Sequence, residues 1–535
     1  MLSFFNKNLF IALSILVLVF AAGLRLYKLA DVPHGMTWDE AAIGYNGYAI
    51  LTTRRDEWIF KLPVSFRSFG DYKAPFAIYL NGLFTFLFGL NLWAVRLPFV
   101  LVGIGSVLGM ILLTKELGIK IGWQKKQIFW LSLISGILLS ISPWHLHYSR
   151  TGFESGMALG FTVWGAFLLL RAYNKDKLNW FSLYSSVFFF VLTLYTYHSS
   201  KIVTPLLVLS ILLWNKDKVF KYFKHLLLAG ISGLVILYPL IKDSIYGKGL
   251  ERAGTLIFNQ SDSTVEVVVT FIKQLFAHLT PSFLVLGETT SFRHGDGKWG
   301  VLLPITYFLV LTGLVFFIKK IRSGKIDKNY LFIFFWIFIG IIPAALGAEL
   351  VPHSNRALLA LPGFLLLAIY GLNDLSSWLK ATKLNKQIPG SHGAKNMVWV
   401  SVMGIMIFLQ TLFFIKYINN YYSDFAKISA NDFTDGYLEA FDYVKEFEKD
   451  KEKIVFTSEY GQPYIYALFS RKTNPIWYQG GSLIKYEFKE VNVGDLERQN
   501  AVIVAGKSSE FIEASRADKV IYGSDGEVRF KIFIR

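Results

Sequence analysis

Asp39 and Glu40 stand side by side in MTWDEAAIGYNGYAI, residues 36 to 50. A carboxylate can accept the proton of a hydroxyl group, and a hydroxyl is a weak nucleophile until it loses that proton. The stretch also has a structural interpretation, because Asp39 precedes the helical run EAAIGYNGYAIL and could cap that helix. By itself it leaves catalysis and helix capping open.

Short motifs further along the chain add carboxylates, basic groups and histidines. They are FGDYKAP (Asp71, Lys73), PWHLHYSRTGFES (His147, Arg150, Glu154), YTYHSSK (His198, Lys201), FRHGDGKWG (Arg293, His294, Asp296) and PHSNRAL (His353, Arg356). Lysine and arginine beside carboxylates suit a phosphate held next to a group that must lose a proton. The motifs therefore predict a site for an anionic substrate.

Each motif also has a plainer interpretation. Lys73 and Lys201 could be anchors whose long side chains reach a membrane surface. Arg150 could contact a lipid headgroup, and Glu154, one helical turn later, could be its salt-bridge partner. The charged and histidine residues of FRHGDGKWG and PHSNRAL could be ordinary polar groups at a membrane interface.

The composition is that of a membrane protein: 53% of the 535 residues are apolar and 17% are charged. The formal charge of +17 comes mainly from lysines in short loops between apolar runs. This is the pattern of cytoplasmic loops in membrane proteins and argues against nucleic-acid binding. The chain has no cysteine, which excludes disulfides and thiolate chemistry.

Apolar runs of span length alternate with basic connectors. A spanning helix needs about 20 apolar residues, and lysine and arginine mark the cytoplasmic side. Lys7 and the connectors at 115–126, 171–177, 216–224, 319–328 and 380–395 are therefore assigned to the cytoplasm. About eleven spans are predicted: 9–26, 94–114, 128–144, 156–171, 180–197, 202–214, 225–242, 301–318, 329–348, 357–373 and 397–415. The first is expected to be an uncleaved anchor, because it is longer than a usual signal-peptide core.

Segment 77–90 breaks this alternation, because as a span it would place the connector 115–126 outside. It is short for a span, so we expect a re-entrant or interfacial helix on the outer side. The outer loops are then 27–93 and 243–300, and VEVVVTFIKQLFAHL in the second is expected to be an amphipathic helix on the membrane.

The tail, 419–535, combines the helical pattern YLEAFDYVKEFEKD with β-type runs such as KIVFTSE, AVIVAG and RFKIFI. It is predicted to be a small extracytoplasmic α/β domain. The whole chain is thus expected to be a mainly α, multi-pass plasma-membrane protein with a cytoplasmic N-terminus. Nearly all polar motifs fall on its outer face, where their gathering predicts a polar cavity.

In this order and spacing, the motifs resemble those of the bacterial relatives of protein O-mannosyltransferases and of the lipid A aminoarabinose transferase, within the GT-C glycosyltransferases. WDEAAIGYNGYAIL resembles the first acidic motif of that family, DYKAPFAIYL its lysine-proline motif, FGLNLWAVRLP the segment that follows, and SPWHLHYSRTGFES its second acidic motif. YTYHSSKIVTPLL and PHSNRALLALP match later positions. The resemblance covers residues 5 to 420 and, weakly, the tail, and it implies a GT-C-like membrane domain over 1–418 followed by an outer domain over 419–535.

The resemblance implies an inverting enzyme that moves a sugar from a polyprenyl-phosphate carrier to an acceptor hydroxyl on the outer face. Asp39 is then expected to be the catalytic base or to orient the acceptor, Glu40 to contact sugar or acceptor, and Glu154 to be the second acidic site. Lys73 is expected to hold the donor phosphate. Its candidate helpers are Arg150, Lys201 and Arg356. The candidates for substrate binding are His198, His353, Arg293 and His294.

The resemblance leaves the metal open, because some relatives use a divalent cation and others do not. Asp39 and Glu154 with a histidine are candidate ligands, and no site is assigned. The expected partners are a polyprenyl-phosphate-linked sugar, a glycan, lipid or protein acceptor, and membrane lipid.

Three other functions compete with this one. An oligosaccharyltransferase shares the architecture, but the tail has no WWDYG-type motif. A lipid-linked sugar flippase would place ionisable residues within its spans, whereas here they cluster at span ends. A degenerate relative that only binds glycans would have no need to keep Asp39, Lys73 and Glu154 together.

Overall fold

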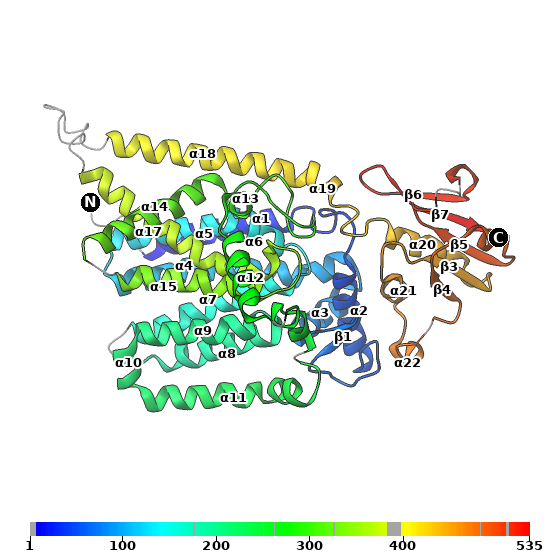
Figure 1. Cartoon of the computed structure of the whole chain (residues 1–535), viewed down its shortest axis with the longest axis horizontal. Coiled ribbons are helices and arrows are strands. Elements are labelled where there is room, and N and C mark those ends of the chain that lie inside the picture. Colours follow the sequence, from blue (N-terminus) through cyan, green and yellow to red (C-terminus); the bar gives the residue numbers. More distant parts are fainter. Residues whose placement is uncertain are drawn as a thin grey trace.

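Helices form at each of the predicted spans, because a backbone within a bilayer must satisfy its own hydrogen bonds. The computed structural model describes residues 7–174, 177–249, 251–261, 263–324, 327–381, 397–481, 483–509 and 513–535. The helices at the predicted spans are α1 (Lys7–Leu26), α4 (Leu92–Ile121), α5 (Lys125–Ile141), α7 (Glu154–Tyr173), α8 (Trp180–Thr196), α9 (Ser200–Trp214), α11 (Phe223–Tyr246), α14 (Pro304–Arg322), α15 (Lys328–Ala345), α17 (Leu361–Ala381) and α18 (Met397–Tyr422). They lie side by side as one bundle (Figure 1).

Eight helices of the described residues are long and apolar enough to cross a membrane. Helices α5, α8 and α9, at 15 to 17 residues, are shorter but run beside them (Figure 1). The predicted fold class, a mainly helical multi-pass membrane protein with a small C-terminal sheet domain, is confirmed.

The basic connectors and the C-terminal domain lie at opposite ends of the bundle (Figure 1). At the connector end, α10 (Lys216–Lys221) joins α9 to α11. Lys120 Nζ donates to Asn215 Oδ1 at 2.5 Å, and Lys218 Nζ donates to the Tyr173 carbonyl at 2.6 Å. Residues 382–395 of the connector 380–395, with 175–176 and 325–326 of two others, lie outside the described residues. The assignment of this end to the cytoplasm stays a prediction.

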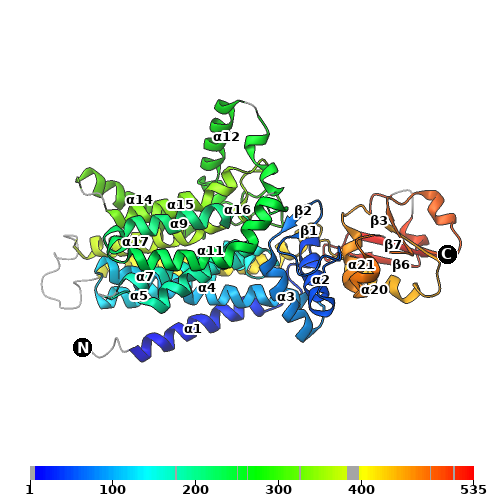
Figure 2. The same ribbon diagram turned by 90° about the horizontal axis from the view of Figure 1, so that it is seen from below.

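The domain-bearing end of the bundle is built from short elements. They are α2 (Trp38–Thr53), β1 (Phe66–Ser68), β2 (Asp71–Lys73), α3 (Pro75–Phe88), α6 (Pro143–Tyr148), η1 (Glu251–Thr255), η2 (Ile257–Asn259), α12 (Thr264–Ala277), α13 (Pro281–Leu284), α16 (Ser354–Ala357), η3 (Leu358–Ala360) and α19 (Asp424–Ile428). The segment predicted to be re-entrant or interfacial is α3, which lies beside α2 at this end (Figure 2). Strands β1 and β2 form an antiparallel hairpin that places Lys73 opposite Phe66.

The C-terminal domain has a five-stranded sheet of order β4-β3-β5-β7-β6. Its elements are α20 (Tyr437–Phe447), β3 (Lys453–Thr457), α21 (Pro463–Arg471), α22 (Pro475–Tyr478), β4 (Tyr486–Lys489), η6 (Val493–Glu497), β5 (Ala501–Ala505), η7 (Ala514–Arg516), β6 (Lys519–Tyr522) and β7 (Val528–Ile534). Strand β3 pairs in parallel with β4 and β5, while β7 is antiparallel to β5 and β6. The runs KIVFTSE and AVIVAG contain β3 and β5, and RFKIFI lies within β7, so all three form strands as predicted.

Helix α2 joins the domain to the bundle. On one side, the buried side chains of Ala41 and Tyr45 belong to the same apolar cluster as Ile465 and Phe469 of α21. The Tyr45 hydroxyl also donates to the Thr473 carbonyl at 2.7 Å. On another side α2 packs against α3, so its position depends on both neighbours.

Helices α2 and α3 approach each other closely at two glycines. A Cβ added to Gly47 would lie 2.6 Å from the Gly82 nitrogen and 2.7 Å from the Ile78 carbonyl oxygen. These neighbours are backbone atoms, so the contact cannot be relieved by a side-chain movement.

Gly47→Ala is therefore expected to separate α2 from α3 and to destabilise the protein by about 1–3 kcal/mol. The measurement is the melting temperature of the detergent-solubilised chain. Gly404→Ala in α18 is the matched control, because a Cβ there has nothing within 4 Å. Equal melting temperatures for the two variants would show that the contact does not constrain α2.

Candidate functional site

Asp39 lies in the first turn of α2, which begins at Trp38. Thr37 caps the helix: its hydroxyl oxygen accepts from the Glu40 amide at 3.2 Å, and the Glu40 carboxylate accepts from the Thr37 amide at 3.0 Å. The capping role considered for Asp39 thus belongs to Thr37, with Glu40 completing a capping box. The Asp39 side chain takes no part in this cap and lines a cavity instead.

Two carboxylates share one lysine at this cavity. Lys73 Nζ lies 2.6 Å from Asp39 Oδ1 and 3.8 Å from Glu154 Oε1. Glu154 is the first residue of α7, so both acids stand at helix N-termini, where the helix dipole favours negative charge. All three side chains are only partly exposed, at 13 to 25%. The site therefore combines two proton acceptors with a cation in a restricted space.

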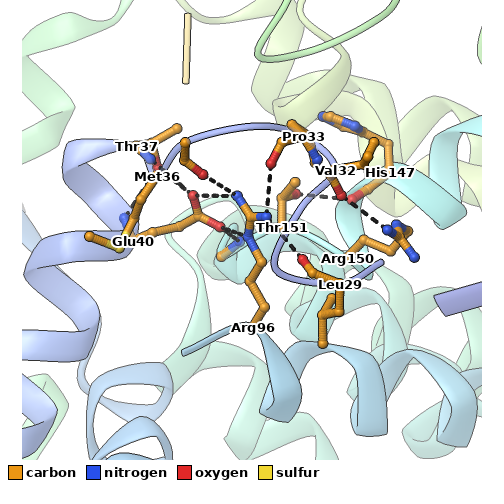
Figure 3. Close-up of polar contacts among 12 residues, drawn as sticks. Leu29, Val32, Pro33, Met36, Thr37, Glu40, Arg96, His147, Arg150 and Thr151 are labelled. Atoms are coloured by element: carbon orange, nitrogen blue, oxygen red, sulfur yellow. Dashed lines mark hydrogen bonds and ion pairs between the residues drawn. The ribbon is translucent and has the colours of Figure 1, made fainter. Parts of the chain in front are cut away.

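Glu40 points away from the cavity and is fully buried. Its carboxylate accepts from Arg96 Nε at 2.7 Å and from the Gly152 amide at 3.0 Å (Figure 3). The five N–H donors of Arg96 are all used, on Glu40 and on the carbonyls of Leu29, Pro33 and Gly35. This geometry does not fit the expectation that Glu40 contacts sugar or acceptor, because a buried carboxylate already paired with arginine cannot reach a substrate.

Arg150 is likewise buried and committed to backbone. It donates to the carbonyls of Leu24, Arg25, Tyr27, Lys28 and Val32, at 2.8 to 3.1 Å. The expected roles of a donor-phosphate ligand and of a salt-bridge partner for Glu154 therefore do not fit, since its Nη groups point at the last turn of α1 and at the connector that follows it.

The cavity has a volume of about 1860 Å³, its open mouth included, and lies at the domain-bearing end of the bundle. Nine of the eleven candidate residues from the sequence line it: Asp39, Lys73, Glu154, His198, Lys201, Arg293, His294, His353 and Arg356. They come from α2, β2, α7, α9, α16 and the loops next to them. The structure thus brings together motifs that are up to 317 residues apart in sequence, from Asp39 to Arg356.

Cationic side chains form a second part of the cavity wall. The Arg293 guanidinium lies 3.7 Å from the centre of the Trp38 ring, and its Nε donates to the Asp432 carbonyl at 2.7 Å. Lys201 Nζ donates to the Gly249 carbonyl at 2.5 Å. These contacts fix both cations in the wall of the cavity. The hydrogen-bond acceptors in them are backbone carbonyls, not carboxylates.

Arg356 differs from these two cations, because its Nη2 lies 2.6 Å from Glu349 Oε1. His353 Nε2 also approaches the Glu349 carboxylate, at 3.4 Å. Glu349 lines the cavity and places a carboxylate in its basic wall. An incoming anion would compete with Glu349 for Arg356.

The histidines of the cavity are held by specific partners. His198 Nε2 lies 2.8 Å from the Tyr72 carbonyl, next to Lys73 in β2. His294 Nδ1 lies 3.0 Å from the Tyr148 hydroxyl, and burial lowers the pKa of His294 well below its usual value. His294 is therefore neutral at physiological pH and can donate or accept a hydrogen bond, but it adds no positive charge.

The candidate metal ligands are Asp39 and Glu154 with a histidine. Among the residues that the structure describes, no three His, Asp or Glu side chains lie close enough together to hold a metal ion. Asp39 and Glu154 converge on Lys73 instead.

Two solved structures resemble the chain over nearly its whole length. No protein-family model matches the sequence. The crystal structure of ArnT from Cupriavidus metallidurans bound to undecaprenyl phosphate superposes with a TM-score of 0.51 at 12% identity, over 98% of this chain and 97% of that one. The archaeal oligosaccharyltransferase AglB from Archaeoglobus fulgidus, in complex with an inhibitory peptide and a dolichol-phosphate, superposes with a TM-score of 0.52 at 13% identity, over 94% of this chain and 70% of that one.

The chain shares the fold of these two proteins, which is the GT-C-like membrane architecture that the motifs imply. In sequence, it is 24% identical over 232 residues to "Putative mannosyltransferase YycA" of Bacillus subtilis (strain 168). That alignment spans 42% of this chain and 30% of the Bacillus protein. The resemblance to GT-C glycosyltransferases that the motifs predicted is confirmed.

Arg96 and Glu349 were not among the residues predicted to matter for this cavity. Arg96 had a signal in the sequence, a lone charge within the apolar run FGLNLWAVRLP, which in a membrane protein has to find a partner. Glu349 lies in the segment between two spans and carries no comparable pattern.

Arg96→Leu is expected to destabilise the protein by about 3–5 kcal/mol, because Glu40 would remain buried without its partner. The measurement is the melting temperature of the solubilised chain. Lys298→Gln is the control, since it removes an ion pair with Asp424 that is more than half exposed. If Arg96→Leu melted like the control, the buried pair would not hold this end of the bundle together.

Proposed function

We propose that the chain transfers a sugar from a polyprenyl-phosphate carrier to an acceptor hydroxyl, with inversion at the anomeric carbon. The observation that carries this proposal is the convergence of Asp39, Glu154 and Lys73 in one cavity of a GT-C fold. The domain-bearing end, with this cavity, would face the outside of the plasma membrane, and the N-terminus the cytoplasm. The acceptor would be a glycan, a lipid or a protein.

Asp39 would act as the base. Its carboxylate takes the proton of the acceptor hydroxyl while the hydroxyl oxygen bonds to the anomeric carbon. The bond from that carbon to the phosphate oxygen breaks on the opposite face of the sugar, and polyprenyl phosphate leaves with the bonding electrons. A single displacement of this kind inverts the configuration.

Lys73 would couple the proton transfer to Asp39 with the departure of polyprenyl phosphate. In the structure its Nζ lies 2.6 Å from Asp39 Oδ1. When Asp39 takes the proton it loses its charge, and the ammonium group is released toward the phosphate as negative charge develops there. Lys201 and Arg293, which line the same cavity, would add positive charge to that phosphate.

Asp39→Asn is expected to lower kcat by about 10²–10⁴-fold, because an amide cannot accept the acceptor proton. The measurement is sugar transfer by the purified full chain in nanodiscs, with melting temperature as the check on folding. Asp424→Asn is the matched control: its carboxylate is exposed and pairs with Lys298 outside the cavity. Full transfer by a folded Asp39→Asn variant would contradict the role of base.

The donor class is tested by offering the purified chain two sets of compounds, polyprenyl-monophosphate sugars and polyprenyl-diphosphate oligosaccharides. The acceptors are identified by mass spectrometry. Transfer from the monophosphate arm is the expected result. Transfer from the diphosphate arm alone would favour an oligosaccharyltransferase. Movement of the lipid-linked sugar between leaflets without transfer would identify a flippase.

A further inference from the structure

His294 lies between two hollows of the protein. It lines the cavity that holds Asp39 and Lys73, and it also lines a smaller pocket beside that cavity. Tyr148 lines the smaller pocket, and its hydroxyl contacts the ring of His294. The hydrogen bonds on that side decide which ring nitrogen of His294 carries the proton, because the partner of one nitrogen sets the state of the other.

A chain of three hydrogen bonds leads from the His294 carbonyl to the His294 ring. The Ser354 hydroxyl lies 2.6 Å from the carbonyl oxygen of His294, and since a carbonyl can only accept, Ser354 donates its proton there. The Tyr148 hydroxyl lies 2.8 Å from that of Ser354 and must donate to it, because the Ser354 proton is already used. The Tyr148 oxygen then accepts from His294 Nδ1, at 3.0 Å. The chain therefore places the ring proton on Nδ1.

The second ring nitrogen of His294, Nε2, is left as a hydrogen-bond acceptor. Burial, and after it the neighbouring His353, lower the pKa of His294 well below its usual value, so the ring carries a single proton. With that proton on Nδ1, the Nε2 atom offers a lone pair and no N–H group. The two nitrogens of an imidazole point in widely different directions. A ring that turns Nδ1 toward Tyr148 thus turns Nε2 away from it, to the side of the cavity.

The charges near Nε2 determine what it can bind. Arg293 and Arg356 line the same cavity wall and attract an anion such as a phosphate, whereas the lone pair of Nε2 repels one. A neutral hydroxyl group, in contrast, can donate its proton to Nε2. A sugar that is joined to a phosphate at this wall would bring its hydroxyl groups next to His294.

We propose that His294 Nε2 accepts a hydrogen bond from a hydroxyl group of the transferred sugar and thereby helps to select that sugar. This inference rests on the proposed function and adds to it a residue that recognises the donor. Tyr148 and Ser354 are positioning residues, because they act through His294 by holding its proton on Nδ1. A sugar that lacks the hydroxyl would leave Nε2 without a donor and would bind less tightly.

The position of the ring proton is measured by NMR on the full chain in nanodiscs, with ¹³C and ¹⁵N in the histidine rings. The ring-carbon shifts distinguish the Nδ1–H form from the Nε2–H form, and comparison with His294→Gln identifies the signals of residue 294. The Nδ1–H form is expected at neutral pH. Tyr148→Phe removes the acceptor of Nδ1 and is expected to increase the Nε2–H form. A wild-type ring that carries a proton on Nε2 would overturn the inference, because it would offer the cavity no acceptor.

The hydroxyl group is identified with polyprenyl-phosphate hexoses and analogues that each lack one hydroxyl. One analogue is expected to lower kcat/KM of the wild type about 3–10-fold, mainly through KM, which corresponds to one neutral hydrogen bond. His294→Leu is expected to show that loss with the complete donor and no further loss with that analogue. His294→Gln should recover part of the loss, because its amide oxygen can accept. His225→Leu, near the start of α11 at the connector end of the bundle, is the control.

Two results of the transfer assay would overturn the inference alone: full kcat/KM in His294→Leu, or the same loss in that variant with the complete donor and with every analogue. In both, sugar transfer itself would stand. If no donor were transferred by the folded wild type, the proposed function would fail and the inference with it. Melting temperatures check the folding of each variant, and if His294→Leu did not fold, the ring-carbon shifts would decide.

Discussion

Two buried arginines hold the connector between α1 and α2, and the geometry of the site depends on them. This connector is irregular backbone at the end of an apolar bundle, where carbonyl groups without donors would be costly. Arg96 and Arg150 donate to six of these carbonyls, three each, and Arg150 also donates to two carbonyls in the last turn of α1. The charge of Arg96 is balanced by Glu40, which in turn caps α2 and accepts from Gly152 just before α7. One carboxylate thus links the starts of the two helices that carry Asp39 and Glu154.

This arrangement explains why the neighbours Asp39 and Glu40 have different roles, one in the cavity and one in the buried contacts. Neighbours in a helix point about 100° apart, so Asp39 and Glu40 cannot both face the cavity. Asp39 takes the open side and meets Lys73, while Glu40 takes the buried side and meets Arg96. The face of α2 that carries Tyr45 packs against the C-terminal domain. Helix α2 therefore contacts the bundle and the C-terminal domain and also carries Asp39 of the site. A movement of the domain would displace Asp39.

The sequence predicted which residues line the site better than it predicted the hydrogen bonds and ion pairs of those residues. The spans and the clustering of polar motifs follow from local patterns, and those patterns were enough to place Asp39, Lys73 and Glu154 in one cavity. The partners of Glu40 and Arg150 could not be predicted in this way. Those side chains are satisfied by groups distant in sequence, such as Arg96 for Glu40, and a helical pattern shows only which face a residue occupies. Glu349 is a different case: its partners His353 and Arg356 are near it in sequence, but no regular pattern pairs the three side chains.

The cavity wall is negatively charged in one region and positively charged in another, and this separation would orient a bound donor. Asp39, Glu154 and Lys73 together are net negative, whereas the wall that holds Lys201, Arg293 and Arg356 stays net positive even with Glu349 included. In a restricted space of low dielectric constant such a separation orients a charged ligand before any specific hydrogen bond forms. For a polyprenyl-phosphate sugar, the phosphate would turn toward the positive wall and leave the acids to the sugar and the acceptor hydroxyl. Lys73 pairs with the acids of the negative region, and a small movement of its flexible side chain would let it exchange Asp39 for the departing phosphate of such a donor.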